Sequence, residues 1–313
     1  MDNNVLSQPQ EQYDDEIDLR ELFGVLWAGK IKIIAITAVF AIASVIYALS
    51  VPNQYKATAL LAPAQSDGGG LSGALGQLGG LASLAGVSLG GGEGGEAQIA
   101  QEIMKSWSYI ESFIDDNNIA VEVYAAEGWN KLSNELVIDD DLYDTAQKSW
   151  LIEDDDTGEL RPPTSWELFE EFQEKLSVSE DKKSGLVSVS IEYYSPQIAK
   201  QWVDMYVDAV NRFMQQRQVD KVTKNITYLQ EQIEKTSIAE MQEVFYTIIE
   251  EQTKNKMLAE ASPEYVFVAV SPSMVPEQKS QPKRALICIL GTLLGGMLSV
   301  LLVLIMHYAK KTD

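Results

Sequence analysis

The chain has 313 residues, and its 46 Asp and Glu outnumber its 24 Lys and Arg, which gives a net charge of −22. An acidic surface of this size repels phosphate backbones, so we expect no nucleic-acid partner. The chain has one histidine and one cysteine, which is too few for a His-containing triad, a Cys–His pair or a zinc ligand set. We therefore predict no enzyme, no metal and no cofactor, with a two-carboxylate glycosidase as a minor alternative.

Two apolar stretches, residues 33–51 and 285–308, contain no Asp, Glu, Lys or Arg. Each is long enough to cross a bilayer as a helix, although a cleaved signal peptide is an alternative for the first. Lysines precede the first stretch and follow the second, which favours cytoplasmic termini. The predicted segments are a cytoplasmic 1–32, a transmembrane helix 33–51, an exported domain 52–284, a transmembrane helix 285–308 and a cytoplasmic tail 309–313.

The domain begins with a predicted strand at 54–61, which is followed by a glycine-rich tract at 68–96. Thirteen of the 29 residues in this tract are glycine, and no lysine lies between Lys56 and Lys105. A phosphate-binding loop needs a lysine after its last glycine, so the tract predicts a loosely packed excursion instead.

The middle of the domain alternates helical and strand patterns. Apolar residues spaced by three or four predict a helix at 97–118. The acid-rich region 119–163 lacks the spacing of a calcium loop and is predicted to be solvated surface. A capping box at 164–167 opens an amphipathic helix, and residues 176–179 and 186–191 alternate as the two strands of a hairpin.

No Gly or Pro occurs between Pro196 and Pro263, a run of 66 residues. A continuous helix of this length would extend about 100 Å and would project from the domain. Its apolar stripe would then pack against the helix 97–118 or against other copies of the chain. A phase slip near 236–237 leaves two shorter helices as an alternative. The predicted stripe consists of Val222, Ile226, Leu229, Ile233, Met241, Phe245 and Ile248.

The end of the domain is predicted to be a strand at 265–270 and a stiff, proline-rich lead at 272–284. Three prolines, Pro272, Pro276 and Pro282, hold this lead extended. In the second span, Gly291 and Gly295 form a GxxxG spacing with Gly296 adjacent, which allows two helix backbones to approach closely.

These elements predict an α+β fold between two transmembrane helices. A membrane-proximal mixed base is built from 52–66, 164–195 and 264–271, and a long helical arm from 97–118 and 197–262 projects from it. The order of elements resembles the Wzz family of polysaccharide co-polymerases, or O-antigen chain-length determinants. The resemblance rests on local similarities at 18–22, 55–59, 79–86 and 195–202, and above all on the prolines and glycines between Pro272 and Gly295.

The resemblance implies a two-pass protein of the bacterial inner membrane whose large domain is periplasmic and whose protomers assemble side by side. It implies a non-catalytic regulator that sets the length of lipopolysaccharide O-antigen or a related glycan. Its partners would be itself, a Wzy-type polymerase, the lipid bilayer and the growing glycan. A membrane-anchored periplasmic scaffold or adaptor for export is the main alternative, and a sensor ectodomain is a weaker one.

Overall fold

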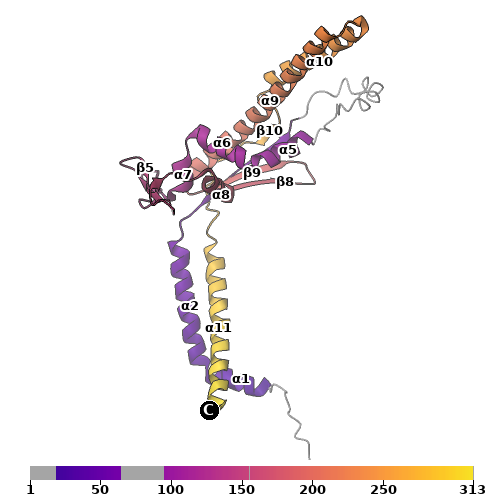
Figure 1. Ribbon diagram of the computed structural model, residues 1–313. Coiled ribbons are helices and arrows are strands. Elements are labelled where there is room, and N and C mark those ends of the chain that lie inside the picture. The colour runs from indigo at the N-terminus through magenta and orange to yellow at the C-terminus, as the bar shows by residue number, and fades with distance from the viewer. Residues whose placement is uncertain (1–18, 65–94, 155, 313) are drawn as a thin grey trace, which may run out of the picture. The chain divides into compact units, whose positions relative to one another are not determined.

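The computed structural model describes residues 19–64, 95–154 and 156–312, which divide into two units (Figure 1). The first unit is formed by the two ends of the chain, up to Val51 and from Pro282. The second unit is the domain Pro52–Gln281. Most of the glycine-rich tract, including the motif at 79–86, lies outside the described residues.

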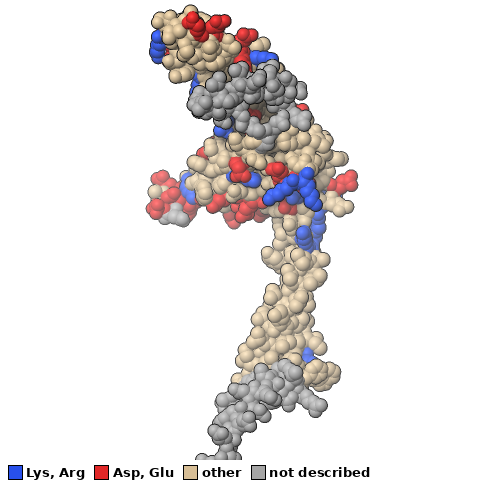
Figure 2. Space-filling view, turned by 90° about the vertical axis from the view of Figure 1, so that its right-hand side faces the viewer, with Lys and Arg blue, Asp and Glu red and all other residues tan. Residues whose placement is uncertain are grey.

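The described part of the first unit contains three helices, α1 (Leu19–Ala28), α2 (Lys30–Ser50) and α11 (Arg284–Thr312), of which α2 and α11 pack along each other. Both are long and apolar enough to cross a membrane, over Lys30–Ser50 and Arg284–His307. The surface of this pair carries almost no charged side chains in the view of Figure 2. The predicted spans 33–51 and 285–308 therefore coincide with helices, whereas α1 was not predicted.

The second unit is built on a four-stranded antiparallel sheet in the order β10-β1-β9-β8. These strands are β1 (Tyr55–Pro63), β8 (Leu176–Glu180), β9 (Val187–Tyr193) and β10 (Phe267–Ser271). Alternate residues of β1 and β9 are buried, as the pairs Ala57↔Ile191, Ala59↔Val189 and Leu61↔Val187 show. The predicted strands and hairpin are confirmed, because one face of the sheet carries the apolar half of each alternating sequence.

The predicted helix 97–118 is two helices, α5 (Gly95–Met104) and α6 (Trp107–Asn117). Ser106 interrupts the helix with an extended backbone, and its hydroxyl donates to the carbonyl of Ile103 at 2.7 Å. Both helices pack into the core of the base through Met104, Ile110 and other buried residues. Assigning 97–118 to the arm was therefore wrong: its apolar spacing serves the base.

The region 119–163 contains a short helix, α7 (Ala120–Tyr124), and three two-stranded hairpins. Their strands are β2 (Ala126–Asn130), β3 (Glu135–Ile138), β4 (Tyr143–Asp144), β5 (Ser149–Trp150), β6 (Ile152–Glu153) and β7 (Leu160–Arg161). The side chains of Asn130, Asp144 and Asp154 each accept backbone N–H groups two and three residues on. Some acids that were predicted only as solvated surface therefore form the turns.

Helix α8 (Ser165–Lys175) begins with the predicted capping box. The Thr164 hydroxyl accepts the Glu167 N–H at 3.2 Å, and the Glu167 carboxylate accepts the Thr164 N–H at 2.6 Å. This reciprocal pair satisfies two backbone donors that a helix start leaves free.

The long helical run is not continuous: α9 (Pro196–Lys235) ends at Thr236 and α10 (Ala239–Ala261) folds back along it (Figure 1). The Gln215 amide donates to the carbonyls of Ala259 at 2.9 Å and Ser262 at 3.1 Å, which places the end of α10 beside the middle of α9. The 100 Å helix was therefore wrong and the two-helix alternative is correct. Folding back keeps both apolar stripes on one seam despite the phase slip, which a straight helix would not do.

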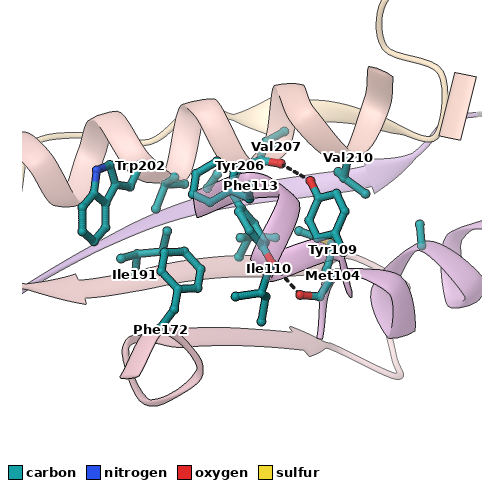
Figure 3. Packing of buried hydrophobic residues seen from close by; sticks show 14 of the residues in the cluster. Met104, Tyr109, Ile110, Phe113, Phe172, Ile191, Trp202, Tyr206, Val207 and Val210 are labelled. Atoms are coloured by element: carbon teal, nitrogen blue, oxygen red, sulfur yellow. Dashed lines mark hydrogen bonds between the residues drawn. The ribbon is translucent and has the colours of Figure 1, made fainter. Parts of the chain in front are cut away.

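The core of the base lies between the sheet, α6, α8 and the first half of α9 (Figure 3). Tyr206 lies at its centre, with its ring centroid 4.7 Å from that of Phe113 and 5.6 Å from that of Phe172. Its hydroxyl donates to the Met104 carbonyl, and its own carbonyl accepts from Tyr109 at 3.2 Å. Residues 196–214 of α9 therefore belong to the base, and the arm consists of residues 215–261.

Candidate functional site

The candidate functional site is a surface. Among the described residues, no group of three or more His, Cys, Asp or Glu could hold a metal ion. One hollow is lined by Glu250, Thr253, Lys254, Met257 and Leu258. All five residues lie on α10, so this hollow is an open depression along one helix. The features with functional potential are therefore the faces of the arm, the α2–α11 pair and the proline-rich lead.

Most of the predicted arm stripe lies in the seam between α9 and α10. The seam residues are spaced alternately by three and four along both helices, which is the pattern of an antiparallel coiled coil. On α9 they are Gln215, Val219, Val222, Ile226, Leu229 and Ile233, and on α10 they are Gln242, Phe245, Ile249, Gln252, Lys256 and Ala259. Among the large apolar residues of the seam, Val222 is buried and the others are partly buried.

The arm also has an outer apolar face, which the sequence analysis merged with the seam. Two predicted stripe residues, Met241 and Ile248, are exposed, as is Val244 between them. These three residues follow the helical spacing of three and four, and each precedes a seam residue by one position, so they lie about 100° around α10 from the seam. Further exposed apolar residues of the arm are Tyr228, Ile238, Tyr246, Met257 and Leu258. A second series of apolar residues spaced by three and four, which begins at Met241, would have distinguished the outer face from the seam.

The glycines of α11 lie against α2. A Cβ atom on Gly291 would lie 2.5 Å from Ser44 Cβ, and one on Gly295 would lie within 3.0 Å of Phe40 Cβ. By contrast, a Cβ on Gly296 would meet only Thr37 Oγ1, at 4.0 Å. The structure therefore uses Gly291 and Gly295 for close packing within the chain, and Gly296 lies at the margin of that contact.

Two further residues of this packing face were not predicted from the sequence. Ser299 and Val303 continue the four-residue spacing of Gly291 and Gly295, and both are buried. The Ser299 hydroxyl is hydrogen-bonded to that of Thr37 at 3.3 Å, and Val303 packs where α2 has no side chain, at Gly29. Extending the GxxxG spacing by two further turns would have found both residues.

Residues 272–281 of the proline-rich lead are attached to the base. The buried Ser273 hydroxyl is hydrogen-bonded to the Asp204 carboxylate and to the Lys200 carbonyl, both on α9. Near the other end, Ser280 N–H donates to the Gln54 carbonyl at 2.8 Å and Gln54 N–H donates to the Gln281 carbonyl at 3.1 Å. Of the three predicted prolines, Pro272 is exposed, Pro276 is partly buried and Pro282 is buried. Serine side chains and backbone bonds, in addition to the prolines, therefore fix this segment.

The electrostatics of the base are structural. Arg161 contacts both oxygens of Glu167, at 2.8 and 2.9 Å, and lies 3.5 Å from Asp154. Hydrogen bonds from Arg161 lower the pKa of Glu167 to about 2. Burial raises the pKa of the Tyr206 hydroxyl well above its usual value, so Tyr206 stays a neutral hydrogen-bond donor. The shift of Glu167 follows from an ion pair and that of Tyr206 from burial in the core, so neither marks a reactive group.

The family model of Wzz, chain length determinant protein, matches residues 15–117. A full-length bacterial polysaccharide co-polymerase is similar at 15% identity and a TM-score of 0.38, over 96% of this chain and 99% of that one. A fragment of WzzB, a polysaccharide co-polymerase from Salmonella Typhimurium, is similar at 13% identity and a TM-score of 0.30, over 73% of this chain and 100% of that one.

No curated protein sequence shows a significant match to the chain. The family match covers β1, α5 and α6, and also the stretch from α1 through α2 that contains the first apolar span. The chain is therefore similar to the Wzz family over residues 15–117, about a third of its length.

Proposed function

We propose that this protein is a non-catalytic regulator of surface polysaccharide chain length. It acts as an oligomer in the bacterial inner membrane, together with a Wzy-type polymerase that makes lipopolysaccharide O-antigen or a related glycan. The match to the chain length determinant family supports the general function. The exposed apolar residues on the outer face of the arm are the main support for the proposed mode of action.

The outer face supports assembly of several copies. Met241, Val244 and Ile248 are 44%, 54% and 37% exposed, and they align on one side of α10. Apolar residues gathered on one helix face mark an interaction surface more often than single exposed ones do. The occupant we propose is the arm of a second copy, since a two-helix arm shields only its seam. Side-by-side arms would then hold several base domains at one polymerase.

The proposed topology has two passes with both termini in the cytoplasm and the domain Pro52–Gln281 in the periplasm. Lys30 and Lys32 lie at the start of α2, and Lys310 and Lys311 lie near the end of the chain. This placement agrees with the excess of Lys and Arg in cytoplasmic segments. Arg284, at the start of α11, is one of the positive charges on the domain side. Its guanidinium group donates a hydrogen bond to the Ala48 carbonyl at 2.9 Å.

Deletion of the gene tests the function. Its loss should change the length distribution of the surface glycan from modal to random, and a profile that stays modal would refute the proposal. An export adaptor would instead reduce the amount of surface glycan at unchanged length, so the same gel separates the two functions.

Three substitutions on α10, Met241→Ser, Val244→Ser and Ile248→Ser, test the arm. We expect a smaller oligomer by native mass spectrometry, unchanged helix content by circular dichroism and loss of the modal length. The matched control is Glu240→Ser, Glu243→Ser and Thr247→Ser, which alters exposed positions of the same helix turns. If the apolar triple variant assembles like this control, the outer face is not the interface.

A further inference from the structure

Helix α1 is separate from the membrane-spanning helix that follows it. Gly29 ends α1 by donating to the Val25 carbonyl at 2.9 Å, and its own carbonyl accepts from Ile33 at 3.1 Å. Among the described backbone hydrogen bonds, none joins the amides of residues 30–32 to the carbonyls of 26–28. The helix ladder is therefore broken for one turn, and α1 turns away from the direction of α2 (Figure 1).

Packing inside the first unit fixes this elbow. A Cβ on residue 29 would lie within 3.0 Å of Val303 Cγ1, so the glycine lets α11 pass close to the bend. Val25 and Leu26 are partly buried, and α1 contacts both α11 and α2. The direction of α1 is therefore set by contacts with both helices and does not depend on the single glycine alone.

The outer side of α1 carries two exposed aromatic residues. Phe23 is 69% exposed and Trp27 is 66% exposed, and they lie one helical turn apart. Gly24 and Ala28, which follow them by one residue, are also exposed but lie about 100° further around the helix. The Lys30 ammonium lies 4.6 Å from the centre of the Trp27 ring, a cation–π contact at the start of α2.

We propose that α1 lies in the plane of the bilayer interface and binds phospholipid through Phe23, Trp27 and Lys30. The occupant follows from chain continuity: α1 is joined by one residue to a helix that is apolar enough to span the membrane. It must therefore lie at headgroup depth, where aromatic rings are enriched and lysine ammonium groups reach the phosphates. A protein partner would have to compete with lipid at this depth.

Spin labels on the full-length chain in proteoliposomes test this placement. The background variant is Cys288→Ala, and single cysteines replace Phe23, Gly24, Trp27 or Ala28 in turn. The vesicles contain phosphatidylethanolamine and phosphatidylglycerol. Collision rates with oxygen, which partitions into lipid, and with a water-soluble nickel chelate report the surroundings of each label.

We expect the ratio of oxygen to nickel collisions to be several-fold higher at positions 23 and 27 than at 24 and 28. Leu298, exposed in the middle of α11, provides the bilayer reference, and Glu243 of the arm provides the water reference. Nickel access at all four positions would show that α1 is in water. Protection from both reagents at 23 and 27 would show a protein partner, and either result would overturn the proposal.

A second measurement needs no label and keeps the apolar face intact. Brominated phosphatidylcholine quenches tryptophans in contact with acyl chains, so wild type should lose more fluorescence than the variant Trp27→Phe. Equal losses would contradict contact between Trp27 and lipid. Both measurements are independent of glycan length, so they test the placement of α1 separately from the proposed function.

Discussion

The base and the arm solve the same packing problem in different ways. In the base, aromatic residues from three helices interlock, and Tyr206, Phe172 and Trp202 are at most 2% exposed. In the arm, one seam joins two helices, and only Val222 and Ala259 of its apolar residues are buried. The base therefore holds a complete core of its own, whereas the arm leaves Met241, Val244 and Ile248 exposed outside its seam.

The α2–α11 pair resembles the base in this respect. Its small residues bring the two backbones together, and the hydroxyls of Thr37 and Ser299 between the helices are hydrogen-bonded to each other. The base and the helix pair are thus each packed within one chain, whereas we propose that the arm is completed by other copies. Four variants would test this division.

The largest effect is expected for Tyr206→Ala in the base. Removing a fully buried ring should lower the free energy of unfolding by about 3–5 kcal/mol. The control Tyr206→Phe removes only the hydroxyl that bonds Met104 and should cost about 1–2 kcal/mol. Thermal unfolding of the full chain in detergent measures both. Equal effects of the two variants would mean that the aromatic cluster does not hold the base together.

In the helix pair, Gly291→Leu combined with Gly295→Leu should destabilise the packing of α2 against α11 by about 1–3 kcal/mol. The reason is steric, since each new Cβ would overlap with Ser44 or Phe40. The matched control is Gly296→Leu, because a Cβ there has room. We expect a lower thermal stability in detergent and loss of modal glycan for the double variant only. A modal profile from the double variant at wild-type protein level would remove these glycines from the functional residues.

In the arm, Leu229→Ala should cost about 1–2 kcal/mol, because this seam residue is only partly buried. The effect should be local, so hydrogen exchange should quicken in α10 and stay unchanged in α6 and β9. Dissociating the oligomer should quicken exchange in α10 in the same way. Exchange in α10 that is as slow as in β9, in a dissociated chain, would show that the arm is complete without partners.

The smallest effect is expected at the rim of the base, for Glu167→Gln. Hydrogen bonds from Arg161 hold the pKa of Glu167 at about 2, below the ordinary value of 4.5. The ionised group therefore stabilises the fold above pH 4.5, and this contribution is lost as the pH falls towards 2. At pH 7 the variant should be less stable by about 1 kcal/mol, and the difference from wild type should shrink below pH 4.5. Glu170→Gln, which alters an exposed position of the same helix, should show no such trend.

The sequence predicted the sheet strands, the capping box and both spans because each depends on local pattern. Alternation along 186–191 and the Thr164–Glu167 spacing determine structure within a few residues. The apolar spacing of 97–118 predicted a helical segment correctly but could not show what it packs against. The partner of α6 is Tyr206, almost 100 residues later in the chain, and such a pairing leaves no local signal.

The reversal of the chain between α9 and α10 could not be predicted from the sequence for the same reason. The phase slip near 236–237 is visible in the sequence, but it allows either a bend or a reversal. The reversal is fixed by Gln215, whose amide contacts carbonyls more than 40 residues away. Likewise, the GxxxG spacing pointed to close packing without identifying Phe40 and Ser44 as the surfaces that meet it.

Hydrogen bonds join the beginning of the domain to its end and the beginning of the arm to its end. This arrangement has a consequence for how the fold can vary. Gln54 is tied to Ser280 and Gln281 where the domain begins and ends, and Gln215 ties the beginning of the arm to its end. The domain is thus inserted between the two apolar helices, and the arm is inserted into the base. Each inserted segment begins and ends at neighbouring points. An insert closed in this way can change in size without displacing its host. Adding one heptad to each arm helix would lengthen the arm by about 10 Å and leave the base unaltered. Relatives of this chain could therefore vary the reach of the arm while keeping one and the same base.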